Sequence, residues 1–173
     1  MLRKPVKMNW RRVLPIASLV AVVIAADQLS KYLIRAHLGL GQAVPHGWPV
    51  QITNIENSGS AFGLFGDQTG FLIVASVIAI GIMLYFYRQV AGGHALLRIS
   101  LGLQLGGALS NLADRIRFGH VTDFIDFKKW PVFNVADSCI TVGIVILVLT
   151  VLLQGERKTG SSSAAGVPPT SAS

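Results

Sequence analysis

Long runs without charge alternate with short polar segments along this chain, and four of the runs have the length of a membrane helix. Residues 68–87 carry no charge over 20 residues, and residues 138–155 carry none over 18. A helix needs about 20 apolar residues to cross a bilayer. The pattern therefore predicts a polytopic all-α membrane protein with four spans, at residues 13–34, 68–87, 96–113 and 134–154.

The first span and one further charge-free run differ from the other apolar segments. The charge-free part of the first span has only 14 residues, so its helix must continue past Asp27 and Lys31. A basic start and a short apolar core are also typical of a cleaved signal peptide, but three later spans already commit the chain to the membrane. Residues 36–55 are free of charge as well. Because Pro45, Pro49 and several glycines interrupt them, we expect a loop or strand outside the membrane.

Composition supports a membrane protein of one domain. The chain has 173 residues, of which 51% are hydrophobic and only 13% are charged. Soluble domains carry about 25% charged residues. An ordinary soluble enzyme, a disordered protein and a disulfide-stapled domain are all disfavoured. The single cysteine, Cys139, lies in the fourth span, where a small packing residue is the simplest interpretation.

The net charge of +7 indicates orientation and not nucleic-acid binding. With both termini on one side, nine of the 15 basic residues fall on that side, and seven of the eight acids fall at or beyond the opposite ends of the spans. The positive-inside rule then makes the termini cytoplasmic. We expect a basic cytoplasmic N-terminus (1–12), a membrane-embedded unit (13–154) with periplasmic segments 35–67 and 114–133, and a disordered cytoplasmic tail (155–173).

Ionisable groups in membrane helices are costly and are therefore candidates for function. Asp27 and Lys31 are four residues apart and share one helical face. A structural ion pair and a chemical role both fit this spacing. In the third span, Asn111, Asp114 and Arg115 reach the outer surface on a second face, where they either form a site or satisfy a helix end. A row of small residues predicts close helix packing: Gly102, Gly106 and Ser110.

Two segments outside the spans add candidates. Residues 120–127 alternate as a strand, with Asp123 on the more apolar face and Asp126 on the other. Burial would raise the pKa of Asp123, whereas Asp126 is more easily explained as solvated. The run from Asn57 to Gly59 is a turn signal, and its Asn could also hold an extended peptide by the main chain.

The fourth span begins with polar side chains on one helical face. Asn134, Asp137 and Thr141 follow at spacings of three and four. A carboxylate one turn into a membrane helix needs a partner. A second Asp that shares one proton with it would permit acid–base chemistry on a water molecule. A buried, hydrogen-bonded Asp–Asn cluster without chemistry is the alternative.

Five motifs occur in order along the chain: Asp27-Gln28-Leu29-Ser30-Lys31, Asn57-Ser58-Gly59-Ser60-Ala61-Phe62, Gly106-Gly107-Ala108-Leu109-Ser110-Asn111-Leu112-Ala113-Asp114-Arg115, Val121-Thr122-Asp123-Phe124 and Phe133-Asn134-Val135-Ala136-Asp137. Together they resemble the bacterial lipoprotein signal peptidases, the signal peptidase II family. The family usually has Gly where this chain has Ser110 and Ala where it has Ser60. Both are exchanges between small residues.

The resemblance implies an inner-membrane aspartic endopeptidase with its site on the periplasmic side. Such an enzyme removes signal peptides from prolipoproteins before a diacylglyceryl-modified Cys, with no metal or other cofactor. It implies a monomer in contact with membrane lipid, a β-cradle at about residues 42–65 and a short interfacial helix. The implied catalytic pair is Asp123 and Asp137. The implied substrate-binding residues are Asn57, Asn111, Arg115 and Asn134, and the implied supporting residues are Asp27, Lys31 and Asp114, the first two bracing the sheet.

Two other functions fit parts of the sequence. A small transporter or proton-coupled channel could use Asp27, Asp123 and Asp137 as a relay. Gln104 is the only polar group that continues toward the cytoplasmic side, however, and a relay needs polar groups across the whole bilayer. A non-enzymatic assembly subunit could use the small-residue row of the third span, but it would leave the paired acids unexplained.

Overall fold

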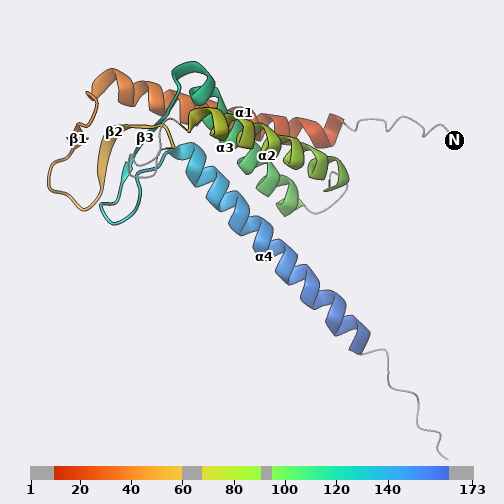
Figure 1. The fold of residues 1–173 in the computed structure, drawn as a ribbon. Coiled ribbons are helices and arrows are strands. Elements are labelled where there is room, and N and C mark those ends of the chain that lie inside the picture. Colours follow the sequence, from red (N-terminus) through yellow and green to blue (C-terminus); the bar gives the residue numbers. More distant parts are fainter. Residues whose placement is uncertain (1–9, 60–67, 91–94, 164–173) are drawn as a thin grey trace, which may run out of the picture.

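Four long helices and one small sheet make up the computed structural model, which describes residues 10–59, 68–90 and 95–163. The elements follow one another in the order α1 (Trp10–His37), β1 (Ala43–Val44), β2 (Gln51–Asn57), α2 (Thr69–Val90), α3 (Ala95–Phe118), β3 (Val121–Asp126) and α4 (Val135–Ser163). The sheet lies at one end of the helices (Figure 1). The expected architecture of four helices and a small sheet is confirmed.

Three of the helices are long and apolar enough to cross a membrane, namely Val13–His37 within α1, Thr69–Tyr87 within α2 and Val135–Leu153 within α4. The third predicted span, α3, does not reach that hydropathy. The reason is its position, because α3 packs against all three other helices. Its buried side chains include Ser100, Gln104 and Asn111. A helix enclosed by protein can carry polar groups that a lipid-facing helix cannot.

Glycines let the backbone of α3 approach its neighbours closely. A Cβ at Gly106 would lie 2.8 Å from Val23 Cβ of α1, and one at Gly107 would lie 2.5 Å from the carbonyl oxygen of Ala136 in α4. A Cβ at Gly102 would also meet α1, at Leu19. The small-residue row predicted from the sequence therefore packs on α1, while Gly107 admits the first turn of α4.

The outward faces of the helices are apolar. Val22 of α1, Phe71 of α2 and Leu152 of α4 are each at least 60% exposed. α4 packs along α3, with Gly143 against Ser100 and Gln104, and its C-terminal part extends beyond the other helices (Figure 1). Soluble proteins rarely expose so much contiguous apolar surface. These faces suit contact with lipid.

The sheet is antiparallel, with strand order β1-β2-β3. β2 pairs with β3 through Ile55 and Asp123, with a register shift between Ile52 and Ile55. The strand predicted at residues 120–127 and the sheet predicted near residues 42–65 are thus present, although residues 60–65 lie outside the described residues. The expected interfacial helix is not among the elements of the described residues.

Two helix ends differ from the sequence-based bounds. α3 continues to Phe118, so its helix runs from the predicted span into the first residues of the segment predicted at 114–133, among them Asp114 and Arg115. α4 continues to Ser163, so residues 155–163 of the predicted disordered tail are helical. Composition suggested a tail because Gly and Ser have weak helix propensity, but a helix already nucleated in the span can continue through them. Residues 164–173 lie outside the described residues.

Candidate active site

Asp123 is a buried carboxylate held by two asparagine amides. It lies in β3 and is 2% exposed. Its Oδ2 accepts a hydrogen bond of 2.8 Å from Asn57 Nδ2, and its Oδ1 accepts one of 2.6 Å from Asn134 Nδ2. Burial, together with a smaller effect of the charge of Asp137, outweighs the two amide hydrogen bonds and raises the pKa of Asp123 to about 6. Asp123 therefore takes up a proton far more readily than an exposed Asp.

The second carboxylate, Asp137, forms the start of α4 together with Asn134. Asn134 Oδ1 accepts the backbone N–H of Asp137 at 2.9 Å, and Asp137 Oδ2 accepts the backbone N–H of Asn134 at 3.3 Å. This reciprocal pair is a capping box, which satisfies two backbone donors at the helix N-terminus. Because the cap fixes Asn134, the same side chain that starts the helix also holds Asp123. One residue thus positions both acids.

Asn111 holds Asp137 from the neighbouring helix. Its Nδ2 donates to Asp137 Oδ1 at 2.8 Å. Its Oδ1 accepts from Lys31 Nζ at 2.8 Å and from Asn134 Nδ2 at 3.3 Å. Lysine can only donate, so its contact fixes which end of the Asn111 amide faces Asp137. The orientation of this amide therefore depends on a charge in α1.

The two carboxylates form a coupled pair held by amides. Among the contacts of the described residues, no hydrogen bond joins Asp123 to Asp137 directly, and neither forms an ion pair. Asp137 is half-buried, while Asp123 is buried. The negative charge of Asp137 helps Asp123 to retain a proton. Such a pair offers one acid and one base to a water molecule.

Arg115 adds a positive charge beside the pair. Its guanidinium interacts electrostatically with Asp137, Asp123 and Asp114. Its Nε atom is buried and has no hydrogen-bond partner among the described residues. A buried donor without a partner is costly, and in a native site it usually awaits a ligand or water. The alternative that Arg115 only satisfies a helix end does not account for this placement.

Behind the pair lies a fully buried group of charges: Asp27, Lys31 and Asp114. Lys31 Nζ lies 2.7 Å from Asp27 Oδ2 and 2.8 Å from Asp114 Oδ2. The Asp114 contact is an ion pair without hydrogen-bond geometry. Together with its bond to Asn111, Lys31 thus meets three acceptors, which equals its number of donors.

Asp27 also fixes α4 to α1. Its Oδ1 accepts the backbone N–H of Ala136 at 2.8 Å, and its Oδ2 accepts Ser110 Oγ at 2.7 Å. Asp27 therefore caps the first turn of α4 from another helix. The expectation that Asp27 and Lys31 brace the sheet is wrong, because their contacts go to α3 and α4. Both residues lie well before the end of α1, at the level of the first turn of α4.

Other sequence candidates lie apart from the pair. Asp126 is bound at both oxygens by Lys128, whose side-chain and backbone hydrogen bonds hold the pKa of Asp126 below its usual range. Thr141 lies one turn after Asp137 in the same helix and is exposed. The turn at Asn57 is confirmed, since Asn57 Oδ1 accepts the N–H of Gly59 at 2.9 Å.

Two residues of the network were not singled out from the sequence. Gln28 Nε2 donates to Asp114 Oδ1 at 2.8 Å and to Ser110 Oγ at 3.0 Å. Arg35 donates to Thr122 at 2.8 Å and so ties α1 to the strand that carries Asp123. The signal for Gln28 was present, because an amide inside an apolar span needs partners. Arg35 looked like an ordinary basic residue at a helix end.

The fold and the site define a multi-pass membrane protein with a coupled pair of aspartates at the sheet end of its helices, which is the arrangement of a membrane-embedded aspartic peptidase. The sequence profile of "Signal peptidase (SPase) II" matches residues 19–153. The chain belongs to the signal peptidase II family and removes signal peptides from prolipoproteins. The transporter and assembly-subunit hypotheses are set aside.

Similar proteins support this membership across most of the chain. The lipoprotein signal peptidase of Moorella thermoacetica is 44% identical over 141 residues, which cover 81% of this chain and 94% of that protein. The one from Desulforapulum autotrophicum is 40% identical and covers 84% and 96%. A bacterial membrane enzyme solved by the in meso method at 1.9 Å is 28% identical, with a TM-score of 0.74 over 80% of this chain and 92% of that chain.

Proposed function

We propose that Asp123 and Asp137 are the catalytic residues of this peptidase and that they activate one water molecule between them. The observation that carries the proposal is Asn134, which holds Asp123 through its amide and Asp137 through the helix cap. Because Asn134 binds both acids, their relative position is fixed before a substrate binds. Such preorganisation is what acid–base catalysis requires.

In the proposed mechanism the two acids have different roles because their surroundings differ. Asp123 is the more buried, and its raised pKa favours it as the acid that holds the shared proton. Asp137 is half-buried and acts as the base that takes a proton from the water. The water attacks the scissile carbonyl, Asp123 stabilises the developing oxyanion, and a proton then passes to the leaving amine.

The substrate-binding part of the proposal assigns the free donors to the peptide backbone. Among the contacts of the described residues, Asn57 and Asn111 each use one of their two amide hydrogens on an acid, and Arg115 Nε has no partner. These donors suit substrate carbonyl groups next to the scissile bond. Asn134 uses both amide hydrogens within the protein, so its proposed role is limited to orienting the two acids around the substrate.

The finer localisation is also a proposal. We infer a bacterial inner-membrane protein with cytoplasmic termini and a periplasmic site, supported by the nine basic residues on the side of the termini. The sheet end would then face the periplasm. The substrate is proposed to be a prolipoprotein with a diacylglyceryl-modified Cys, whose acyl chains lie in lipid against exposed apolar helix faces, and the enzyme is proposed to act as a monomer.

The test is cleavage of a diacylglyceryl-Cys precursor by the purified protein, followed by mass spectrometry. We expect Asp123→Asn and Asp137→Asn each to lower the cleavage rate by about 10³-fold or more. The matched control is Asp126→Asn, which removes a carboxylate from the same strand and is expected to leave the rate within about twofold. A product that begins at the lipidated Cys is expected. If Asp123→Asn kept normal turnover while Asp114→Asn abolished it, the proposed pair would be wrong.

A further inference from the structure

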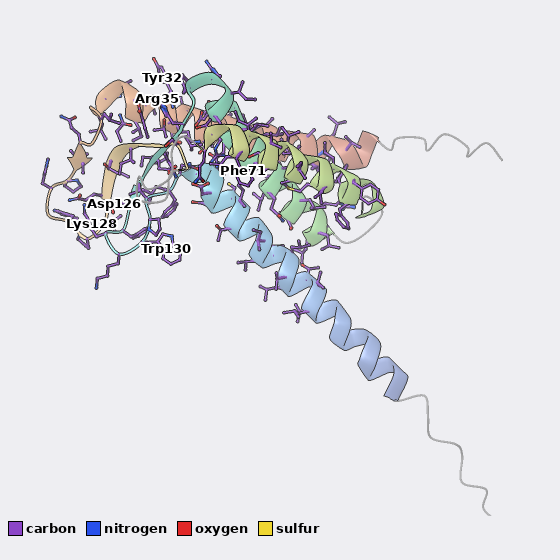
Figure 2. The ribbon with its side chains drawn as sticks, viewed as in Figure 1. Tyr32, Arg35, Phe71, Asp126, Lys128 and Trp130 are labelled. Carbon is purple, nitrogen blue, oxygen red and sulfur yellow. The ribbon has the colours of Figure 1, made fainter. Side chains whose placement is uncertain are left out.

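A pocket lies between α1 and the end of α3, and neither Asp123 nor Asp137 lines it. Its volume is about 490 Å³, and its lining consists of Gln28, Tyr32, Arg35, Ala36, Arg117 and Phe118. The α1 residues fall on one helical face at the end that carries the sheet. Figure 2 shows Tyr32 and Arg35 on the side of this end away from Lys128 and Trp130.

The two arginines converge on one aromatic ring. The guanidinium carbon of Arg35 lies 4.7 Å from the centre of the Phe118 ring, and that of Arg117 lies 5.3 Å from it. The two cations therefore lie within about 10 Å of each other, the sum of these distances. Cation–π contact holds each guanidinium over the ring. The ring thus keeps two like charges at the mouth of one pocket.

The positive charge of this pocket is not neutralised within the described part of the chain. No carboxylate is among its lining residues, and neither Arg35 nor Arg117 forms an ion pair among the described residues. Asp114 lies behind Gln28 but is fully buried and already paired with Lys31. Two converging guanidinium groups without a counter-ion match an anion with several oxygens, above all a phosphate group.

The surroundings of the pocket indicate a lipid as the source of that phosphate. The pocket lies at the end of the span Val13–His37, where lipid headgroups lie. Leu29 and Leu33 of α1 are 59% and 45% exposed beside it, and Tyr32 is 62% exposed. Tyr at this level is typical of the membrane–water interface. A diacyl lipid could therefore place its chains along α1 and its phosphate between the arginines.

We propose that the pocket of Arg35, Arg117 and Phe118 binds the phosphate group of an anionic membrane phospholipid. The ligand class follows from two unneutralised guanidinium groups next to an apolar helix face. The proposal is independent of the peptidase chemistry. Arg35 also bonds to Thr122, next to Asp123, so the test relies on Arg117, which has no hydrogen bond among the contacts of the described residues.

The experiment is native mass spectrometry of the full chain in detergent, titrated with dioleoylphosphatidylglycerol. We expect a bound lipid whose apparent affinity falls by about tenfold in Arg117→Gln. Lys129→Gln, which removes one exposed charge from the same end of the molecule, is the matched control and should bind like the wild type. Arg117→Lys keeps the charge but loses the planar fork, and we expect an intermediate loss. This second variant keeps the test valid if Arg117→Gln does not fold.

Two further arms identify the source of the phosphate. Dioleoylglycerol has the same acyl chains without the phosphate and should bind much more weakly than the phospholipid. Millimolar inorganic phosphate should not displace the bound phospholipid. The proposal is overturned if Arg117→Gln and Arg117→Lys bind the lipid like the wild type, if dioleoylglycerol binds equally well, or if inorganic phosphate displaces the lipid and so identifies a free anion as the ligand.

Discussion

At the scale of single residues, the ionisation of Asp123 acts against folding. Its pKa rises from an ordinary value of 3.8 to about 6 on burial. A carboxyl whose folded pKa is raised binds its proton more tightly in the folded state, so stability falls as the pH rises from about 4 to about 6 and stays lowered above that. A shift of about two units corresponds to about 3 kcal/mol. The site thus holds a carboxylate at the expense of stability.

This cost predicts an unusual behaviour of Asp123→Asn. The variant removes the free-energy cost of ionising the buried Asp123 carboxyl. It also leaves one asparagine N–H without its acceptor, which lowers the stability by about 1 kcal/mol. We expect it to be more stable than the wild type at pH 7.5 by about 2 kcal/mol, and the difference to shrink to near zero by about pH 5 as Asp123 becomes protonated. Thermal unfolding in detergent at both pH values measures this.

Asp126→Asn is the control, because the pKa of Asp126 is lowered whereas that of Asp123 is raised. Hydrogen bonds from Lys128 lower the pKa of Asp126, so its ionised form stabilises the folded state above its unfolded pKa and this contribution is lost as the pH falls through its folded pKa. We expect Asp126→Asn to be no more stable than the wild type at pH 7.5. A wild-type protein that is more stable than Asp123→Asn by the same amount at both pH values would contradict the account of Asp123.

Lys31 is the buried cation on which the charges behind the site depend. Its removal leaves Asp27 and Asp114 facing each other without compensation, and breaking a buried pair costs about 3–5 kcal/mol. We expect Lys31→Met to unfold at a much lower temperature in detergent, whereas Lys129→Met, which removes an exposed lysine, should be neutral. Asp114→Asn should recover part of the lost stability in the Lys31→Met background. If the two lysine variants were equally stable, Lys31 would not be needed to neutralise Asp27 and Asp114.

At the scale of elements, the contact of α3 with α4 sets the geometry of the site. Gly107 lies against the backbone of Ala136, one residue before Asp137. A Cβ there would lie 2.5 Å from a carbonyl oxygen, which cannot move without moving the first turn of α4. The hydrogen bond between Asn111 and Asp137 spans the same contact. The acid pair therefore depends on a glycine that takes no part in chemistry.

We accordingly expect Gly107→Ala to lower both the unfolding temperature and the cleavage rate, the latter by about 10²-fold because misplacement by about 1 Å has that effect on positioned groups. Gly81→Ala is the matched control, since a Cβ at Gly81 of α2 has open space around it. Ala has a higher helix propensity than Gly, so this variant should be slightly more stable and fully active. Normal cleavage by Gly107→Ala would refute the dependence on this contact.

The sequence predicts helices and local caps better than it predicts which helix lies in the centre. Charge-free runs located all four helices, and alternation located β3. Spacing also placed Asn134 and Asp137 on one face, where they form the cap. It did not reveal that Gly107 faces α4 while Gly106 faces α1. That division depends on the relative positions of three helices, which no local pattern contains.

At the scale of the whole molecule, the polar groups gather where the helices meet the sheet. Asp27 of α1 bonds to the backbone of Ala136 in α4, 109 residues away in the sequence. The spacing of Asp27 and Lys31 predicted their pairing but left their partners open. The capping of α4 by Asp27 requires the assembled bundle, so it could not be derived from either segment alone.

The same arrangement predicts the membrane topology. With the site in the periplasm, Lys129→Cys in a Cys139→Ser background should react with a membrane-impermeant maleimide in cells with an intact inner membrane. Ser171→Cys in the same background should react only after lysis if the tail is cytoplasmic, as we propose. Labelling in the reverse order would place the site on the cytoplasmic side and contradict the positive-inside assignment.

The central claim is that Asp123 and Asp137 act as one catalytic unit, and single-turnover cleavage of a diacylglyceryl-Cys precursor by the two single Asn variants and the double variant tests it most directly. Residues that act as a unit are strongly non-additive. The account predicts that each single substitution lowers the rate by about 10³-fold or more and that the double variant is no slower than the slower single variant. A double variant whose loss equals the product of the two single losses, or a single variant within about tenfold of the wild type, would contradict it.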